Sequence, residues 1–313
     1  METLDAGGGY PRPIRPDKTR VGWIGTGVMG ATMAGRILAA GYSLAVYART
    51  PSKAAALAAA GARLASTPAD AAKGTDVVFT MVGHPSDVRA TVLDPVSGVL
   101  AALSAGGVII DHTSSHPALA REIAAAALAR DCWSIDAPVS GGDVGARDGK
   151  LAIFAGGEEV IIRWLTPLWE ILGKATPMGG PGSGQSSKIA NQITVGGSLL
   201  GLSEALVFAR SAGLDAGEFL AAVRGGAAGS AAMEIWGDRV IERDFRPGGF
   251  VEYMVKDLGM GLEDGDGSDE GSSPAVLPGS ALCRQLYQAM VANGDGKMGT
   301  QGLITVIERI NGK

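Results

Sequence analysis

The stretch Val21-Gly22-Trp23-Ile24-Gly25-Thr26-Gly27-Val28-Met29-Gly30 decides the fold of the first part of the chain. The apolar run Val21–Ile24 has strand length, and the glycine pattern G-x-G-x-x-G follows it at the point where the helical pattern Val28–Ala40 begins. In such a pattern the first glycine permits the tight turn, the second lets the backbone approach a pyrophosphate, and the third lets helix and strand pack closely. An ordinary glycine-rich turn is the alternative. The strand–turn–helix context favours a dinucleotide site that uses Gly25, Thr26, Gly27, Val28, Met29 and Gly30.

Outside this stretch, apolar runs of strand length alternate with segments of helical pattern. The predicted strands are Val21–Ile24, Leu44–Tyr47, Val77–Val82, Val108–Ile110, Trp133–Ile135 and Leu151–Phe154. The predicted helices between and after them are Val28–Ala40, Pro51–Ala60, Ser86–Leu93, Pro117–Arg130 and Glu158–Leu172. Alternation at this short range predicts an α/β fold, with a mostly parallel sheet joined by crossover helices.

The alternation stops near residue 180, at the glycine-rich cluster Gly179–Gly184. Beyond it, Gln185–Ala212 has the pattern of one long helix that is apolar around most of its circumference, which is typical of the middle of a helical bundle or a subunit interface. We therefore predict three parts: a flexible tail at 1–19, a nucleotide-binding domain at 20–180, and a helical domain for substrate and oligomerisation at 181–313.

Composition excludes several classes of function. The 313 residues are 46% apolar and carry a formal charge of −5 without a dense Lys/Arg run, so we expect binding to neither nucleic acid nor membrane. Two cysteines and three histidines are too few for a disulfide framework or a zinc-hydrolase site, so we expect no metal. The first 19 residues lack the apolar core of a signal peptide. We expect a cytoplasmic protein, with an organellar location left open.

The end of the second predicted strand indicates the choice of dinucleotide. An NAD site usually has an acid there that bonds the ribose 2′-hydroxyl, whereas this strand continues into Ala48-Arg49-Thr50. Arg49 can pair with a 2′-phosphate and Thr50 can donate to it. The alternative is that Arg49 is only a solvated cation. We expect NADP(H) to be preferred, with NAD(H) possible.

Two further segments carry chemistry suited to a small acid substrate. Ser140-Gly141-Gly142 exposes consecutive N–H groups and a hydroxyl that can bind a carboxylate, although a plain Gly-Gly turn explains the same residues. Lys188 and Asn191 are three residues apart and share a helix face among apolar neighbours. Burial favours a lysine that exchanges protons near neutral pH. The alternative is a lysine that extends its ammonium to solvent at the start of a helix.

Taken together, four motifs resemble the β-hydroxyacid dehydrogenases, a family that includes 3-hydroxyisobutyrate dehydrogenase and the glyoxylate/succinic semialdehyde reductases. They are the glycine pattern, D-A-P-V-S-G-G from Asp136, K-x-x-N-Q from Lys188, and Val255-Lys256-Asp257-Leu258, in the family's order and spacing. The resemblance is closest to plant-type members. It implies a Rossmann-like domain followed by an all-helical domain, with the active site in the cleft between them.

The resemblance also implies roles for individual residues. Lys188 would give or take the proton, Asn191 would orient the reacting oxygen, and Ser140, Gly141 and Gly142 would bind the substrate carboxylate. Ser114, in the turn Asp111–Ser114, would contact the nicotinamide and the substrate, which would place His112 beside the cofactor. The remaining cofactor contacts would be Met81, Val82, Gly83, Asp87 and Lys256, and Asp257 would support the lysine and contribute to the substrate site.

The sequence departs from the family pattern at three places, one of which is His112, an unusual residue beside the cofactor. Gly249 stands where related reductases carry a phenylalanine over the substrate, and Phe250 beside it could substitute. Residues 263–273, rich in acids and glycine, replace what is normally continuous helix, and we predict an exposed loop without a part in hydride transfer.

These observations favour one class of function over another. The chain is expected to be an enzyme that transfers hydride between NADP(H) and a small hydroxy acid or aldehyde-acid of the 3-hydroxyisobutyrate, glyoxylate or succinic semialdehyde class. A non-catalytic NADP-binding scaffold is the alternative, and an intact Lys188, Asn191 and Ser140 count against it. The long apolar helix predicts a homodimer or homotetramer.

Overall fold

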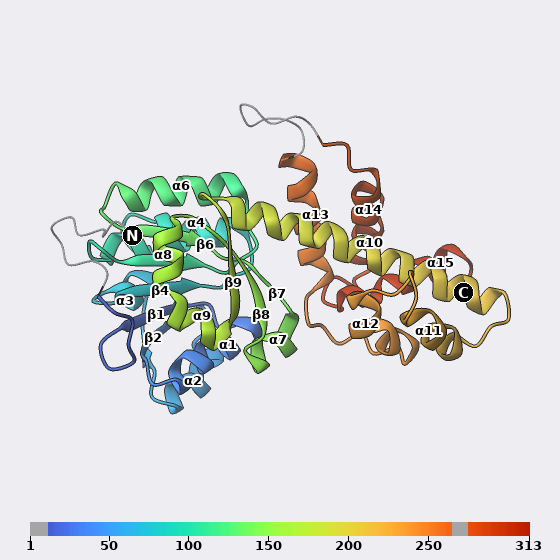
Figure 1. Ribbon diagram of the computed structural model, residues 1–313, viewed down its shortest axis with the longest axis horizontal. Coiled ribbons are helices and arrows are strands. Elements are labelled where there is room, and N and C mark those ends of the chain that lie inside the picture. The colour runs from blue at the N-terminus through green and yellow to red at the C-terminus, as the bar shows by residue number, and fades with distance from the viewer. Residues whose placement is uncertain (1–11, 265–274) are drawn as a thin grey trace. The chain divides into compact units, whose positions relative to one another are not determined.

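The computed structural model describes residues 12–264 and 275–313, and the chain divides between Lys188 and Ile189 into two compact units (Figure 1). The first unit is built on a nine-stranded sheet with the order β3-β2-β1-β4-β5-β6-β8-β7, in which β9 pairs with β8. Strands β1 to β6 are mutually parallel where they pair, β8 runs antiparallel to β6 and β7, and β9 is parallel to β8. The strands are β1 (Arg20–Ile24), β2 (Ser43–Tyr47), β3 (Arg63–Leu64), β4 (Val77–Thr80), β5 (Val108–Asp111), β6 (Trp133–Asp136), β7 (Val139–Ser140), β8 (Leu151–Gly156) and β9 (Gly173–Gly179).

Helices connect the parallel strands and bury both faces of the sheet (Figure 1). Along β4, Val77 and Phe79 belong to one buried cluster and Val78 to the other, which is the alternation that a sheet covered on both faces requires. The helices of this unit are α1 (Val28–Ala39), η1 (Pro51–Ala54), α2 (Ala55–Ala59), α3 (Pro68–Ala72), α4 (Pro85–Leu93), α5 (Val99–Ala102), α6 (Pro117–Leu128), α7 (Gly142–Asp148), α8 (Glu159–Trp164) and α9 (Thr166–Leu172). The predicted α/β class with a mostly parallel sheet is confirmed.

Three local predictions differ from the structure. The strand expected at Val77–Val82 ends at Thr80, because the chain turns there into a loop. The single helix expected at Glu158–Leu172 is two helices, since α8 ends at Trp164 and Pro167 lies in the first turn of α9. Strand β9 was not predicted, because glycine and proline in Gly173–Gly179 are poor strand formers.

The described part of the second unit is helical, with one isolated β-bridge between Phe250 and Gly299. Its elements are the greater part of α10 (Ser183–Ser211), then α11 (Ala216–Arg224), α12 (Ala231–Ile241), α13 (Val251–Asp264), α14 (Pro278–Ala292), η2 (Thr300–Leu303) and α15 (Ile304–Ile310). Glu263 and Asp264 end α13, so the predicted loop does not begin at 263. The rest of that predicted loop, 265–273, lies outside the described residues.

Helix α10 is long and apolar enough to cross a membrane by length and composition alone, with a mean hydropathy of 1.3 over its most apolar window. The core helix of a soluble protein meets the same criterion. Leu199, Leu202 and Leu206 on α10 are buried in the two apolar clusters of the second unit. The helix therefore serves as the packing centre of that unit.

His112 lies in the core of the first unit, which differs from the position beside the cofactor that the motif implied. The side chain is 1% exposed, its ring stacks on Phe79 at 5.4 Å between centroids, and it meets the edge of Trp169 at 6.0 Å. Its Nδ1 lies 2.6 Å from the carbonyl oxygen of Ala137, and its Nε2 has no partner among the described residues. Burial lowers the pKa of His112 from 6.5 to about 4, so the ring is neutral at physiological pH.

Mild acid should therefore destabilise the protein through His112. The folded-state pKa of about 4 lies below the unfolded value of 6.5, so between them the unfolded state binds more protons. The stability that depends on the neutral ring is complete above pH 6.5 and is lost as the pH falls toward 4, a change of about 3 kcal/mol.

The variant His112→Asn isolates this effect, since its amide can still donate to Ala137 and cannot take up a proton. We expect the free energy of unfolding, measured in urea from pH 7 to pH 4, to fall more steeply for the wild type than for His112→Asn. His84 and His116 are retained in both proteins and cancel in the comparison. Parallel curves would show that His112 does not titrate in this range.

Candidate active site

The carboxyl ends of four adjacent parallel strands, β1, β4, β5 and β6, form one edge of the sheet. Backbone hydrogen bonds continue from strand to strand just beyond this edge. Met81 N donates to Ile24 O at 2.8 Å, His112 N to Thr80 O at 2.8 Å, and Ala137 N to Asp111 O at 2.7 Å. The loops that carry the predicted cofactor and substrate residues therefore begin in register. Ligands of open α/β sheets bind at this edge.

The glycine loop after β1 has the geometry that a bound pyrophosphate needs. Gly25 has φ +97°, and a Cβ there would lie 2.1 Å from Met81 O, so only glycine fits the turn. A Cβ on Gly30 would lie 2.2 Å from Gly25 O, so helix and loop are in direct contact. Gly27 is exposed and a Cβ there would meet no atom of the described residues within 4 Å, so their packing does not require this glycine.

The first turn of α1 can receive an anion. Gly27 caps the helix without a side-chain hydrogen bond, and the first turn contains no acidic residue. The leading N–H groups and the positive end of the helix dipole therefore face the open side of Gly27. Thr26 is buried within this loop, while Val28 is 58% exposed and Met29 is half-buried beside the opening. These residues fit the diphosphate of a dinucleotide.

Arg49 and Thr50 lie exposed beyond the end of β2. Arg49 Nη1 is 3.1 Å from Asp87 Oδ1, and the arginine side chain is 84% exposed. Asp87 comes from the first turn of α4 and also accepts a hydrogen bond from His84 N at 3.2 Å. The structure thus brings together two residues that the sequence analysis assigned separately to the cofactor. An exposed ion pair of this kind contributes only about 0–1 kcal/mol.

A buried polar network organises the loops after β4 and β5. Asp111 Oδ1 accepts from Thr80 Oγ1 at 2.7 Å and from Thr113 N at 3.0 Å. Thr113 Oγ1 in turn accepts from Val82 N at 2.9 Å. The half-buried loop Met81–Gly83 is thereby tied to the loop that carries Ser114.

The start of α10 is fixed to the same edge by Asp136, the last residue of β6. Its Oδ1 accepts from Gly182 N and its Oδ2 from Gln185 N, both at 2.8 Å, so the carboxylate caps a 29-residue helix. Burial raises the pKa of Asp136 to about 7, against the opposing effect of the two N–H groups, and the neighbouring Asp111 adds to the rise.

Lys188 lies one turn into this helix and is half-buried. Gln185, on the same helix face, contacts the loop after β5 through its side chain: its Nε2 donates to Thr113 O and its Oε1 accepts from Ser115 N, both at 2.8 Å. The structure therefore brings the helix segment of Lys188 and the loop of Ser114 together in the first unit.

Ser140, Gly141 and Gly142 lie elsewhere on the sheet, where β7 pairs antiparallel with β8. Ser140 pairs with Ala152, Gly141 has φ +130° and caps α7, and Gly142 has φ +63° with nothing within 4 Å of a Cβ. The predicted Gly-Gly turn is present, and it leads directly into α7, which packs beside α1.

In the second unit, Asn191 belongs to a chain of polar contacts. Asn191 Nδ2 donates to Gln192 Oε1 at 3.0 Å, and Gln192 Nε2 donates to Asp257 Oδ2 at 2.9 Å. Asp257 is 4% exposed, and its Oδ1 lies 3.2 Å from Lys256 Nζ, close enough for an ion pair but without hydrogen-bond geometry. Lys256 Nζ also lies 5.5 Å from the centre of the Tyr253 ring. Lys256 and Asp257 on α13 are thus linked to Asn191 through Gln192.

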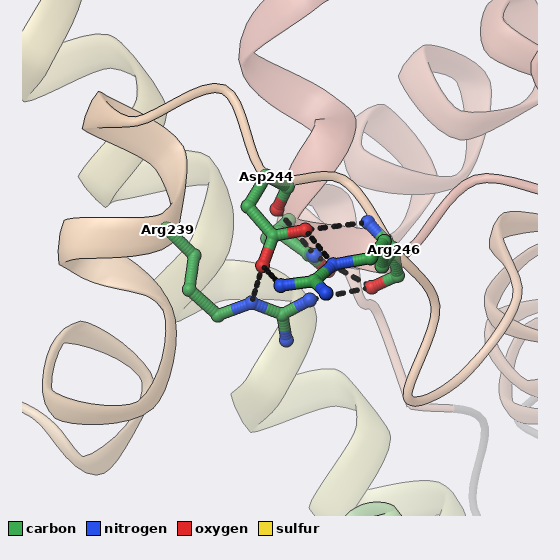
Figure 2. Close-up of polar contacts among 4 residues, drawn as sticks. Arg239, Asp244 and Arg246 are labelled. Carbon is green, nitrogen blue, oxygen red and sulfur yellow. Dashed lines mark hydrogen bonds and ion pairs between the residues drawn. The ribbon is translucent and has the colours of Figure 1, made fainter.

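The loop between α12 and α13 carries Gly249 and Phe250, and an aspartate between two arginines fixes its first part (Figure 2). Asp244 Oδ2 accepts from Arg239 Nε at 3.0 Å and from Arg246 Nη2 at 2.9 Å, and its Oδ1 accepts from Arg246 Nε at 2.8 Å. These bonds hold the pKa of Asp244 well below its usual range. At the end of the loop, the Phe250 ring meets Tyr253 edge-on at 5.5 Å, and Lys297 Nζ lies 5.2 Å from its centre.

The sequence analysis assigned no role to four residues that the structure places in these networks: Thr113, Asp136, Gln185 and Gln192. Asp136 and Thr113 stood inside motifs that were recognised for other residues. A buried acid at the end of a strand was the available signal for Asp136. The bonds of Gln185 span about 70 residues of sequence, and nothing local in the sequence indicates them.

The fold and the glycine loop define a class of protein, a two-unit oxidoreductase with an NAD(P)-binding domain. Residues 20–180 match the family model described as the NAD binding domain of 6-phosphogluconate dehydrogenase. Residues 182–307 match the model described as NAD-binding of NADP-dependent 3-hydroxyisobutyrate dehydrogenase.

Relatives and solved structures agree with these matches. The chain is 54% identical over 303 residues to the probable 3-hydroxyisobutyrate dehydrogenase-like 3, mitochondrial, of Arabidopsis thaliana, covering 97% of this chain and 92% of that protein. It is 36% identical to 2-hydroxy-3-oxopropionate reductase of Escherichia coli, covering 92% and 97%. The crystal structure of 3-hydroxyisobutyrate dehydrogenase from Salmonella typhimurium superposes with a TM-score of 0.82 at 28% identity, covering 92% and 100%.

The chain belongs to the β-hydroxyacid dehydrogenase family and is similar to its plant-type members. The family resemblance that the four motifs indicated is confirmed, and so is the assignment as an oxidoreductase enzyme.

In the loop after β1, alanine at Gly25 should lower the stability of the protein, whereas alanine at Gly27 should weaken cofactor binding. Gly25→Ala places a Cβ against Met81 O at positive φ, and we expect a loss of stability of at least ~2 kcal/mol. Gly27→Ala meets no atom of residues 12–264 and 275–313, so we expect an unchanged melting temperature and at least tenfold weaker cofactor binding, because the methyl group occupies the approach to the helix N-terminus.

Thermal unfolding and fluorescence titration with NADPH measure the two effects separately. Gly213→Ala in the second unit, also at positive φ but in open space, is the control for backbone strain alone. Unchanged cofactor affinity in Gly27→Ala would show that the diphosphate does not lie against this glycine.

Proposed function

We propose that the protein transfers hydride between NADP(H) and a small hydroxy acid or aldehyde-acid of the 3-hydroxyisobutyrate, glyoxylate or succinic semialdehyde class. The observation that carries this proposal is the position of Lys188. It lies one turn into a helix whose first residues are bonded to the carboxyl ends of β5 and β6. The glycine loop for the dinucleotide follows β1 at the same edge of the sheet. The relatives named above act, by their names, on acids of this kind.

In this proposal the residues of the chain divide the work. The bound nicotinamide supplies or accepts the hydride. Lys188 donates a proton to the substrate oxygen in reduction and accepts it in oxidation. Asn191 orients that oxygen, and its amide is itself oriented by Gln192. Ser140, Gly141 and Gly142 bind the carboxylate, and Ser114 contacts substrate and cofactor.

The remaining proposed contacts support this arrangement. Met81, Val82 and Gly83 line the cofactor, with Lys256 contributing a positive charge. Asp257 is held by Gln192 and lies beside Lys256, so its carboxylate stabilises both neighbours. The most informative assay follows NADPH consumption with glyoxylate, succinic semialdehyde and methylmalonate semialdehyde, and NADP⁺ reduction with 3-hydroxyisobutyrate. Turnover of none of the four would contradict the proposed substrate class.

NADP(H) is the preferred cofactor in this proposal because Arg49 stands where an acid would bind the ribose of NAD. A charge-assisted bond to a 2′-phosphate is worth ~1.5–3 kcal/mol, whereas the exposed pair with Asp87 is worth less than about 1 kcal/mol. The phosphate therefore competes successfully with Asp87 for the guanidinium.

A homodimer or homotetramer is proposed from the exposed side of α10. Gly197, Gly201 and Phe208 lie at helical spacing on that side, and Phe208 is 73% exposed. Sedimentation velocity would measure the assembly, and a monomer at micromolar concentration would contradict the proposal.

The word mitochondrial in the name of the Arabidopsis relative supports an organellar location over the cytoplasmic one that the sequence suggested. Imaging of the full chain with a carboxyl-terminal fluorescent tag would distinguish the two compartments. A purely cytosolic signal would contradict the organellar location.

Lys188→Ala should abolish turnover and leave NADPH binding nearly unchanged. General acid–base help contributes ~10²–10⁴-fold to the rate, and the lysine is separate from the diphosphate loop. Steady-state assays and fluorescence titration measure the two properties. Lys174→Ala, at an exposed position of β9, is the matched control and should retain full activity. Retained turnover above a tenth of wild type in Lys188→Ala would refute the assignment.

Arg49→Asp should weaken NADPH binding at least tenfold more than NADH binding, because it removes the cation that faces the 2′-phosphate. Asp87→Asn removes the competing ion pair and should change NADPH affinity much less than Arg49→Asp does. Arg163→Asp makes the same charge change at an exposed position of α8 and controls for net charge. Equal losses for NADPH and NADH in Arg49→Asp would show that Arg49 does not discriminate between the cofactors.

A further inference from the structure

Gln185 is buried, with 1% of its surface exposed, and both ends of its side-chain amide are bonded. Its Oε1 accepts from Ser115 N and its Nε2 donates to Thr113 O, each at 2.8 Å. These two partners are the residues on either side of Ser114. A single amide group therefore fixes the peptide groups that flank Ser114.

The backbone of Gln185 is fixed as well. Its N–H donates to Asp136 Oδ2 at 2.8 Å, and Gly182 N donates to the other oxygen of the same carboxylate. Gln185 and Lys188 are three residues apart on α10, so they share a face and are separated by about 4.5 Å along the helix axis. The residue that holds the loop of Ser114 is thus one turn from Lys188 and rigidly linked to it.

The loop that Gln185 holds is also bonded to its neighbour. Thr113 donates its N–H to Asp111 Oδ1 and accepts from Val82 N through its hydroxyl. A shift of Thr113 would move the loop Met81–Gly83 as well as Ser114. Gln185 is the one side chain in this network, among the residues that the structure describes, that comes from the helix of Lys188 and bonds both sides of Ser114.

We propose that Gln185 is a positioning residue that fixes Ser114 and the loop after β5 relative to Lys188. This inference rests on the proposed function, in which Ser114 and Lys188 contact the reacting molecules. Gln185 itself touches neither substrate nor cofactor in this assignment. It acts by holding two groups of the active site in one register, since small misplacements of reacting groups reduce turnover strongly.

A purely structural role is the competing explanation. Gln185 would then only satisfy two buried polar groups of a loop, as buried glutamines usually do. In that case its loss would lower thermal stability and weaken cofactor binding, while the molecules that remain folded would turn over at the normal rate. The two roles differ in kcat per folded site and in the dependence on Ser114.

Two variants of Gln185 test the proposal. Gln185→Met has a similar length and loses both side-chain bonds. Gln185→Glu can keep the bond from Ser115 N and loses the donor to Thr113 O. Ser186→Ala changes the exposed neighbour on the same helix and is the control. For each protein we would measure kcat, KM, the NADPH dissociation constant and the melting temperature, with the active concentration determined by cofactor titration.

The expected result for Gln185→Met is a fall in kcat of at least tenfold per folded site at saturating NADPH, larger than any rise in the NADPH dissociation constant. Gln185→Glu should lie between Gln185→Met and the wild type. A double-mutant cycle with Ser114→Ala gives the decisive readout: the effect of Ser114→Ala on kcat/KM should shrink at least fivefold when Gln185 is already methionine, since Ser114 is then no longer held in place.

Several outcomes would overturn the inference. They are a kcat within twofold of wild type in Gln185→Met, additive effects in the cycle, or no effect of Ser114→Ala on its own. If Gln185→Met does not fold, the same measurements and the same cycle are made in Gln185→Glu and decide the question. Lys188→Ala separates the two levels of proposal: an active Lys188→Ala overturns both, whereas an inactive Lys188→Ala with a fully active Gln185→Met overturns only the role of Gln185.

Discussion

The carboxylate of Asp136 is the constraint on which the arrangement of the first unit depends. It is buried at the end of β6, and its two oxygens accept the N–H groups of Gly182 and Gln185. Gly182 immediately precedes the 29-residue helix α10 and Gln185 lies in its first turn, where no earlier residue of the helix can accept these N–H groups. The bonds therefore both compensate the buried acid and fix where α10 begins. Within the first unit, the bonds thereby fix the position of the helix start, and with it Lys188, relative to the end of β6.

A second acid lies opposite the first, because Asp111 on β5 pairs in register with Asp136 on β6. Two carboxylates side by side in the core raise each other's energy, and each is satisfied by a different set of donors. Asp111 accepts from a threonine hydroxyl and a loop N–H, whereas Asp136 accepts from the helix. The two acids therefore organise different parts of the edge, and Gln185 joins those parts. A buried network of this kind tolerates few substitutions, because replacing any member leaves its hydrogen-bond partner unsatisfied.

The sequence predicted the elements that depend on local pattern and missed those that depend on tertiary contacts. The glycine loop was predictable because its turn, its helix start and the contact between Gly30 and Gly25 all lie within ten residues. Helix periodicity predicted that Lys188 and Asn191 lie on one helix, and both are on α10. His112 was placed beside the cofactor by its motif, whereas rings from β4 and α9 bury it, and no pattern near residue 112 records that. Strand β9 forms despite its glycine and proline because β8 supplies a partner.

The cofactor site shows the same limit. Arg49 follows β2 where an NAD site usually has an acid, which favoured a 2′-phosphate. The structure brings an acid to that arginine after all, from α4, since Asp87 lies 3.1 Å from Arg49. The strand itself carries no acid at its end, but α4 supplies one to Arg49. In the proposed function, the choice between the cofactors depends on how firmly Asp87 holds the guanidinium. An 84% exposed arginine in a single ion pair is held by less than about 1 kcal/mol, so a phosphate with two charges and three acceptor oxygens is the stronger partner.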